Sequence, residues 1–126
     1  MTSIRILVVD DVFTNRLLMS ELFKSTGNEV VLVENGEQAI EALKTSEFHL
    51  VFMDIEMPVM NGIESTNYIR NEMEYPLNAI PIIALTAHNP ELFFDDYSEV
   101  GFDQLITKPY SIEKIRGIIK ELLNTG

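Results

Sequence analysis

The stretch IRILVVDD, at residues 4–11, is an apolar run that ends in two adjacent aspartates. Apolar runs that do not alternate with polar residues are typical of central strands that helices cover on both faces. Two like charges side by side raise each other's cost of ionisation, so we expect positive charge beside Asp10 and Asp11. The stretch therefore predicts a buried strand that ends in a charged site.

Four further apolar runs follow and alternate with longer segments of helical period. They are EVVLV, HLVFM, IPIIALT and QLIT, at residues 29–33, 49–53, 80–86 and 104–107. Strands that alternate with helices are typical of β/α units and a parallel sheet. The second and third of these runs are nearly all apolar and predict central strands, whereas the first and last are expected nearer the edges.

Amphipathic segments between these runs predict the helices. They lie at residues 13–25, after Asn35-Gly36, at 62–73, at 90–100 and after Ser111. In the first helix we expect Leu18, Leu22 and Phe23 to face the core. Gly117, inside the last helix, is unfavourable by about 1 kcal/mol relative to alanine, which indicates either close packing or a tolerated weak position.

The composition predicts one globular domain over residues 1–126, because 46% hydrophobic content at this length can close a single core. The formal net charge of -11 disfavours nucleic acid and membrane surfaces as direct partners. The absence of cysteine excludes disulfides, thiolate nucleophiles and cysteine metal sites. No signal-peptide pattern or membrane-spanning apolar stretch is present, so we expect a cytoplasmic location.

Polar residues stand where the predicted strands end. Asp10 and Asp11 follow the first strand, and Asp54, Thr86 and Lys108 follow the third, fourth and fifth. Parallel α/β sheets bind ligands at the carboxyl ends of their strands, so these side chains are expected to converge on one edge. The sequence thus predicts a site with three carboxylates, one hydroxyl and one ammonium group.

Three carboxylates without histidine or cysteine nearby suit a hard cation, and Mg2+ that keeps several waters is the natural choice. Mg2+ would supply the missing positive charge, and its remaining positions commonly take water or phosphate. Lys108 would neutralise a further phosphate oxygen, so the chemistry indicated is phosphoryl transfer. Asp54 is the expected nucleophile, because it stands alone between the acidic pair and the Thr86 and Lys108 side.

Four short motifs occur in order along the chain: VVDD, MDIEMPVMNG, ALTA and TKP, at residues 8–11, 53–62, 84–87 and 107–109. Any one of them alone would be weak, but their order and spacing together are specific. With these motifs the chain resembles the receiver domain of two-component response regulators over essentially its whole length. The resemblance implies a flavodoxin-like, doubly wound, five-stranded parallel sheet in the order 2-1-3-4-5 with helices on both faces.

The resemblance also implies a role for each acidic position. Asp54 resembles the phosphoacceptor, Asp11 a direct Mg2+ ligand, and Asp10 an acidic-pocket residue that acts through water. The backbone carbonyl of Glu56 would complete the protein's share of the coordination. These four residues would form the metal half of the site.

The phosphate half of the site is implied in the same way. Thr86 would move its hydroxyl towards the phosphoryl group, and Lys108 would pair with it. Three backbone amides would cradle the phosphoryl oxygens: those of Ile55, Glu56 and Ala87. Pro109 resembles a cis proline that aims Lys108 inward. Leu105 stands where many receivers place Tyr or Phe, so an aromatic switch is not expected there. Either leucine exchanges between rotamers or the signal passes mainly through the loop after Thr86.

A receiver takes a phosphoryl group from a histidine kinase or a histidine phosphotransfer protein, and the resemblance implies these partners here. DDVFTNRLLM and TAH are closest in character to receivers of hybrid histidine kinases. Phosphorylation would then change the surface formed by the fourth helix, the fifth strand and the last helix, and so alter the contact with an unknown downstream protein. It would not be a conventional enzyme, although it would catalyse its own phosphorylation and dephosphorylation.

Three other classes of protein share part of this pattern. A haloacid-dehalogenase-like phosphatase pairs an aspartyl nucleophile with Thr, Lys and Mg2+, but its nucleophile normally follows the first strand. A flavodoxin-like electron carrier would have to bind an FMN phosphate beside carboxylates that repel it. A receiver-like interaction module without phosphorylation is disfavoured because every site residue is present.

Overall fold

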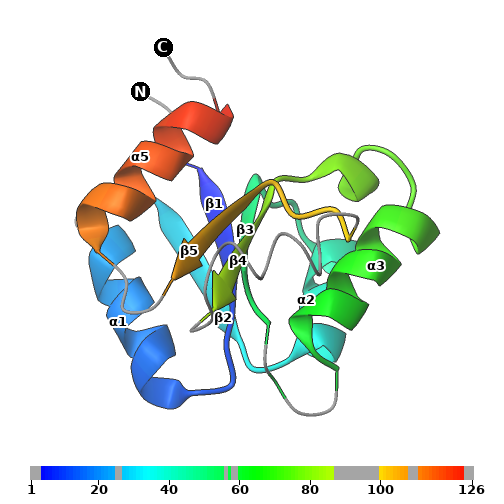
Figure 1. The fold of residues 1–126 in the computed structure, drawn as a ribbon, viewed down its shortest axis with the longest axis horizontal. Coiled ribbons are helices and arrows are strands. Elements are labelled where there is room, and N and C mark those ends of the chain that lie inside the picture. Colours follow the sequence, from blue (N-terminus) through cyan, green and yellow to red (C-terminus); the bar gives the residue numbers. More distant parts are fainter. Residues whose placement is uncertain are drawn as a thin grey trace.

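The computed structural model describes residues 4–24, 27–55, 57, 60–86, 100–107 and 111–123. Its centre is a five-stranded parallel sheet in the order β2-β1-β3-β4-β5 (Figure 1). The strands are β1 (Arg5–Val9), β2 (Glu29–Val33), β3 (Leu50–Asp54), β4 (Ile82–Thr86) and β5 (Gln104–Thr107). The expected fold class and strand order are confirmed.

Helices cover both faces of this sheet. They are α1 (Phe13–Lys24), α2 (Gly36–Thr45), α3 (Gly62–Glu72), α5 (Ile112–Leu123) and the short 3-10 helix η1 (Leu77–Ala79). In Figure 1, α1 and α5 lie on one face and α2 and α3 on the other. The helix expected at 90–100 falls almost wholly on residues 87–99, which lie outside the described residues.

The two faces of the sheet carry separate hydrophobic cores, because neighbouring residues of a strand point to opposite faces. In β1, Leu7 and Val9 pack on the side of α2 and α3, whereas Ile6 and Val8 pack on the side of α1 and α5. All five residues of β3 and of β4 are buried, while β2 and β5 are mostly half-buried. The predicted central and edge strands are therefore confirmed.

An asparagine side chain caps the N-terminus of each of two helices, α2 and α3. Asn35 precedes α2, and its side chain accepts a hydrogen bond from the Gln38 amide at 2.9 Å. Asn61 precedes α3 and forms a capping box, in which its side chain accepts from the Glu64 amide and the Glu64 side chain accepts from the Asn61 amide. These bonds satisfy helix amides that would otherwise lack partners.

One detail of the helices differs from the sequence-based expectation, and a second decides between two alternatives that the sequence left open. Leu18 was expected to face the core but is 44% exposed, whereas Met19 is fully buried. Met19 and Phe23 lie four residues apart and so share the inner face of α1, which turns Leu18 outward by about 100 degrees. A Cβ added at Gly117 would meet no atom within 4 Å, so this glycine is a tolerated weak position and not a close-packed one.

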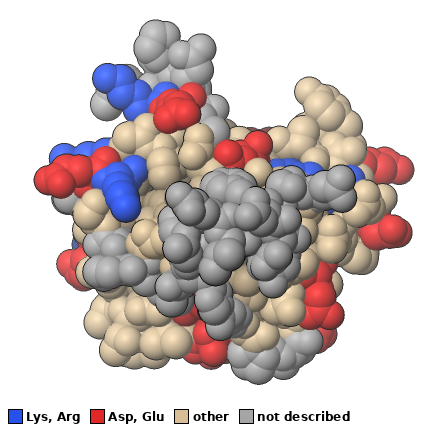
Figure 2. Space-filling view, viewed as in Figure 1, with Lys and Arg blue, Asp and Glu red and all other residues tan. Residues whose placement is uncertain are grey.

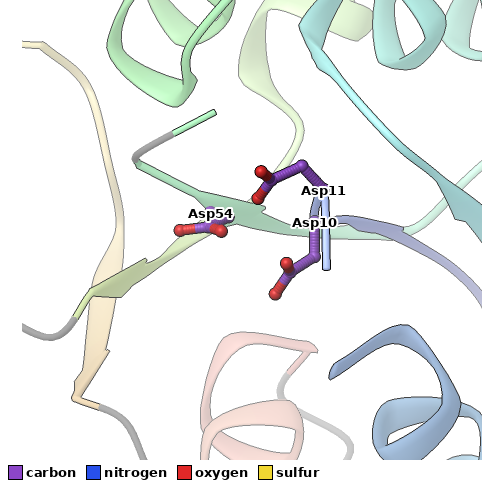
Figure 3. Close-up of side chains that lie close together, drawn as sticks. All are labelled: Asp10, Asp11 and Asp54. Carbon is purple, nitrogen blue, oxygen red and sulfur yellow. The ribbon is translucent and has the colours of Figure 1, made fainter. Parts of the chain in front are cut away.

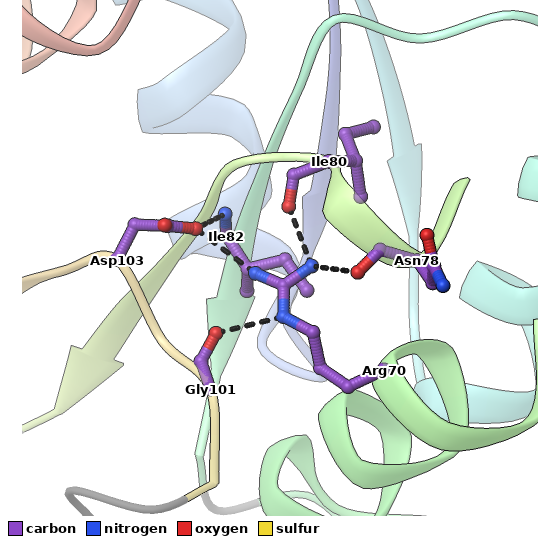
Figure 4. A network of polar contacts seen from close by, with 6 residues as sticks. All are labelled: Arg70, Asn78, Ile80, Ile82, Gly101 and Asp103. Atoms are coloured by element: carbon purple, nitrogen blue, oxygen red, sulfur yellow. Dashed lines mark hydrogen bonds and ion pairs between the residues drawn. The ribbon is translucent and has the colours of Figure 1, made fainter. Parts of the chain in front are cut away.

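Arg70, in the last turn of α3, joins three segments at the edge of the sheet where β4 begins (Figure 4). It donates to the carbonyls of Gly101, Asn78 and Ile80 at 2.9, 3.0 and 2.8 Å, and forms an ion pair with Asp103 at 2.9 Å. The Asp103 carboxylate also accepts from the Ile82 amide at 2.8 Å. This network fixes the entry of β4 and the segment that leads into β5.

The Arg70 network leaves little room around its guanidinium. Gly101 has φ +113°, and a Cβ there would lie 2.9 Å from Arg70 Cγ. Burial lowers the pKa of Arg70 from its ordinary value, and the charge of Asp103 beside it opposes that effect. Arginine nevertheless stays protonated at neutral pH, so the ion pair is intact there.

The surface reflects the acidic composition of the chain. On the face seen in Figure 2, acidic groups are scattered around the edge, and basic groups gather at the upper left over α5. Among the helices that the structure describes, we find no segment long and apolar enough to cross a membrane.

Candidate functional site

Three carboxylates meet where β1 and β3 end. Asp10 and Asp11 follow β1, and Asp54 is the last residue of the neighbouring strand β3. One oxygen from each carboxylate lies within 4.8 Å of the other two. Figure 3 shows their side chains directed towards a common space at the carboxyl edge of the sheet. The structure therefore brings together the three aspartates that the sequence predicted.

Asp10 is held on several sides by its neighbours. Its amide donates to the Val33 carbonyl at 3.1 Å, and its carboxylate accepts from the Val12 amide at 2.9 Å. Its carbonyl accepts from Arg16 Nη1 at 2.8 Å. The side chain is fully buried, whereas Asp11 next to it remains accessible to solvent. This difference fits a supporting role for Asp10 and direct contact with an incoming ion for Asp11.

Asp54 is 2% exposed and closes a strand that is buried on both faces. The next residue, Ile55, donates its amide to the Leu85 carbonyl at 3.1 Å, and its carbonyl accepts from the Gly62 amide at 3.0 Å. The expectation that the Ile55 amide would cradle a phosphoryl oxygen is therefore corrected, because this amide already donates within the sheet.

Thr86 ends β4 on the same edge and is fully buried. It pairs with Thr107 of β5, and Lys108 is the residue that follows Thr107. Leu105, which pairs with Ala84, is half-buried against Ile55 and Ala84. The strand register therefore sets Thr86 beside the chain segment that leads into Lys108.

Four expected site residues lie outside the described part of the chain: Glu56, Ala87, Lys108 and Pro109. The expectation that Pro109 follows a cis bond stays a prediction. Among the described residues, the cis peptide bond recorded joins Tyr75 and Pro76.

The donor set fits Mg2+. All three side chains offer hard carboxylate oxygens, and two of them are held in fixed positions by burial in the sheet. Mg2+ binds through one or a few carboxylates and keeps several waters, so three converging aspartates and an open side at Asp11 meet its needs. The cluster of Asp10, Asp11 and Asp54 can therefore hold this ion.

The sequence reasoning missed two features beside this cluster. The first is Arg16, which binds the Asp10 carbonyl, lies 3.7 Å from the Glu34 carboxylate and stands over the Phe13 ring. The second is an exposed apolar surface at the start of α1, where Phe13 is 66% exposed and Leu17 is 50% exposed. Apolar residues spaced four apart on a helix, in addition to those that face the core, would have indicated this surface.

A parallel sheet in this order, with an acidic cluster at its carboxyl edge, defines an α/β protein whose three converging aspartates can hold a divalent cation. The family model of the response regulator receiver domain matches residues 6–120. The chain belongs to the response regulator receiver domain family, whose members act as phosphoryl-accepting domains of phosphorelay signalling.

Similar sequences occur within much longer sensor proteins. The chain is 39% identical to the sensor protein GacS of Pseudomonas syringae pv. syringae, over 91% of this chain and 13% of that protein. It is 29% identical to the aerobic respiration control sensor protein ArcB of Escherichia coli, over 98% of this chain and 16% of that protein. The chain thus spans well under a fifth of the length of these curated relatives.

Solved receiver domains share the fold. One is the receiver domain of a sensor histidine kinase from Pseudomonas aeruginosa, solved with a magnesium ion coordinated in its active site cleft. It has a TM-score of 0.88 and 26% identity, and the match covers 98% of this chain and 100% of that one. Another is the receiver domain of Ssk1 from Saccharomyces cerevisiae, in complex with the histidine phosphotransfer protein Ypd1. It has a TM-score of 0.84 and 27% identity, and the match covers 94% and 88%.

Proposed function

We propose that this chain, as a single receiver domain, accepts a phosphoryl group from a protein phosphohistidine onto Asp54 with the help of Mg2+. The observation that carries the proposal is the convergence of Asp10, Asp11 and Asp54 within 4.8 Å, with one of the three at the end of a central strand. The solved receiver domains that share the fold include one from a sensor histidine kinase and one in complex with a histidine phosphotransfer protein, which supports phosphohistidine as the donor.

The proposed transfer balances as a substitution at phosphorus. A carboxylate oxygen of Asp54 forms a bond to phosphorus while the phosphorus–nitrogen bond to the donor imidazole breaks. The electron pair stays with that nitrogen, and the imidazole leaves neutral because its other nitrogen carries a proton. When bound, Mg2+ neutralises charge on the phosphoryl oxygens. Thr86 and Lys108 would contact the transferred group, and water would later hydrolyse the acyl phosphate.

The proposal is tested by the intact mass of the native chain after incubation with acetyl phosphate. We expect a mass increase of one phosphoryl group with Mg2+ present, and little or none when the ion is removed by a chelator, because the repulsion between the carboxylates and the donor is then unscreened. Absence of any adduct with Mg2+, from acetyl phosphate and from a phosphohistidine protein alike, would leave the receiver-like interaction module without phosphorylation as the better description.

The start of α1 is the surface we propose for the donor protein. Val12, Phe13 and Leu17 are 43%, 66% and 50% exposed and directly follow the acidic pair. Large exposed apolar side chains that gather beside a reactive site are typical of a protein contact. A donor seated there would carry its phosphohistidine to the carboxyl edge of the sheet.

Replacing Phe13 with alanine should therefore slow transfer from a phosphorylated histidine phosphotransfer domain by roughly 5- to 30-fold, as for an aromatic residue central to an interface. The rate with acetyl phosphate should stay within about twofold, because a small donor needs no protein contact. Both rates are measured by the time course of intact mass.

The matched control is Tyr75→Ala, since Tyr75 is 81% exposed but precedes β4 at the opposite edge of the sheet. Tyr75→Ala should leave both rates unchanged. Equal slowing by the two variants, or equal slowing of both donors by Phe13→Ala, would remove α1 from the proposed contact.

The output of the domain is proposed to run through the face formed by the fourth helix, β5 and α5. Of this face the structure describes β5 and α5.

The proposal also includes self-catalysed phosphorylation and dephosphorylation, without turnover of a separate substrate. A haloacid-dehalogenase-like phosphatase is a poorer description, because its nucleophile normally follows the first strand, whereas Asp54 ends β3. The cytoplasmic location stays a prediction.

A further inference from the structure

Arg16 of α1 is a largely buried charge beside the acidic pair. Its side chain is 13% exposed, and its Nη1 donates to the carbonyl of Asp10 at 2.8 Å. Its Nη2 lies 3.7 Å from the carboxylate of Glu34, the residue that follows β2. The guanidinium also stands over the Phe13 ring, 5.7 Å from the ring centroid. One planar group thus joins α1 to the ends of β1 and β2.

The bond to Asp10 falls where the sheet stops guiding the chain. β1 pairs with β2 and with β3 up to Val9, so the peptide between Asp10 and Asp11 lies just beyond both ladders. The Asp10 amide still donates to the Val33 carbonyl at 3.1 Å, and Arg16 binds the carbonyl at the other end of the same residue. Because the Asp10 carbonyl and the Asp11 amide share one rigid plane, the bond also constrains the direction in which Asp11 leaves the strand.

The two polar contacts of Arg16 differ in weight. The Glu34 side chain is 61% exposed, so its ion pair contributes little by itself. The bond to the Asp10 carbonyl is short, partly buried and donated by a charged group, which places it among the stronger hydrogen bonds of a protein. The hydrogen bond to Asp10 is therefore the contact through which Arg16 can act on the acidic cluster.

We propose that Arg16 is a positioning residue for the candidate metal site. It holds the peptide between Asp10 and Asp11, so that the Asp11 carboxylate meets those of Asp10 and Asp54. The inference rests on the proposed function, because it concerns the Mg2+ that this function needs. Arg16 itself supplies no ligand, since a guanidinium offers donors only.

The sign of the effect on Mg2+ binding separates position from charge. A guanidinium near the site repels a divalent cation, so loss of its charge alone would strengthen Mg2+ binding. Loss of the bond to the Asp10 carbonyl would weaken Mg2+ binding, because the ion would then have to order the Asp11 segment as it binds. If Arg16 acts by position, removal of its side chain weakens binding, whereas a charge effect alone would make binding tighter.

Arg16→Met should bind Mg2+ roughly 10-fold more weakly than the native chain, at the lower end of the loss seen for outer partners of metal ligands. The dissociation constant is measured by titration calorimetry on the unphosphorylated chain, so this readout does not depend on phosphoryl transfer. Arg16→Lys keeps the charge and one donor but not the planar fork, and it should bind roughly 2- to 5-fold more weakly. Lysine is the milder change, so this variant carries the test if Arg16→Met does not fold.

The matched control is Arg5→Met, at the opposite end of β1. Arg5 makes the same three kinds of contact: an ion pair with Glu29, a hydrogen bond to the Glu47 carbonyl and a ring contact with Phe48. It lies five residues before Asp10, about 16 Å along the strand, which exceeds the screening length at physiological salt. Arg5→Met should therefore bind Mg2+ as the native chain does, even where it loses stability.

Native or tighter Mg2+ affinity in folded Arg16→Met would overturn the inference. Equal weakening by Arg5→Met would also overturn it, because the loss would then follow from a general loosening of the fold. Native affinity in Arg16→Lys, where only that variant folds, would do the same. A native chain that bound no Mg2+ and gained no phosphoryl group would instead overturn the proposed function.

Discussion

Asp54→Asn should gain no phosphoryl group from acetyl phosphate or from a phosphohistidine protein, whereas the native chain gains one. An amide cannot attack phosphorus as a carboxylate does, so the loss should be complete within the sensitivity of intact-mass measurement. Asparagine has nearly the same size and keeps a carbonyl oxygen. The buried end of β3, where Asp54 is 2% exposed, should therefore keep its packing.

The control for this loss is Glu41→Gln, which removes one carboxylate from an exposed position in α2. It should be phosphorylated at the native rate. An equal adduct on Asp54→Asn would place the acceptor elsewhere, and Asp11→Asn would then be the next variant to measure. Equal urea midpoints for native chain and variant would exclude unfolding as the cause of the loss.

Arg70→Met should lower the free energy of unfolding by about 2–4 kcal/mol. The side chain of Arg70 is 17% exposed, and it donates to three carbonyls and to the Asp103 carboxylate. Methionine fills much of the same space but leaves those acceptors without their charged donor, which is among the more costly kinds of substitution. Urea unfolding followed by circular dichroism measures the change as a shift in midpoint at constant slope.

Two further variants test whether this loss comes from the network. Arg116→Met removes an exposed arginine of α5 and should change stability by less than about 0.5 kcal/mol. Arg70→Lys keeps the charge but not the planar fork, so its stability should lie between native and Arg70→Met. A stability of Arg70→Met equal to that of Arg116→Met would show that the contacts in Figure 4 contribute little.

The strands and most of the core could be predicted from the sequence, because its apolar runs are clearly distinct from the amphipathic segments between them. The nearly all-apolar runs at 49–53 and 80–86 correspond to β3 and β4, the strands buried at every position. The inner face of α1 was less predictable. The leucines and the methionine of this helix are all apolar, so the sequence pattern does not distinguish them. Packing against β1 and its neighbours places Met19 in the core and leaves Leu18 exposed.

The candidate site was predictable in part, because strand ends meet at one edge and the three aspartates stand there. What the sequence could not reveal is which groups hold the segments between the strands in place. At the edge where β4 begins, Arg70 bonds to residues 8 to 33 positions away, and Gly36 of α2 donates to the carbonyl of Met60, which precedes α3. Asn35-Gly36 indicates a turn before a helix by itself, but the close approach that excludes a Cβ depends on the tertiary fold.

The nearness of Asp10 and Asp54 also has a thermodynamic meaning. Both are almost wholly buried, and their strands are hydrogen-bonded neighbours, so the carboxylates come together only when the chain folds. An ion that binds the folded chain and not the unfolded one adds RT ln(1 + [L]/Kd) to stability, about 2.7 kcal/mol at a free concentration of 100 Kd. The stability of the folded domain should thus rise with the free Mg2+ concentration. The increase in melting temperature at a given concentration then measures how well the three aspartates are aligned to bind the ion.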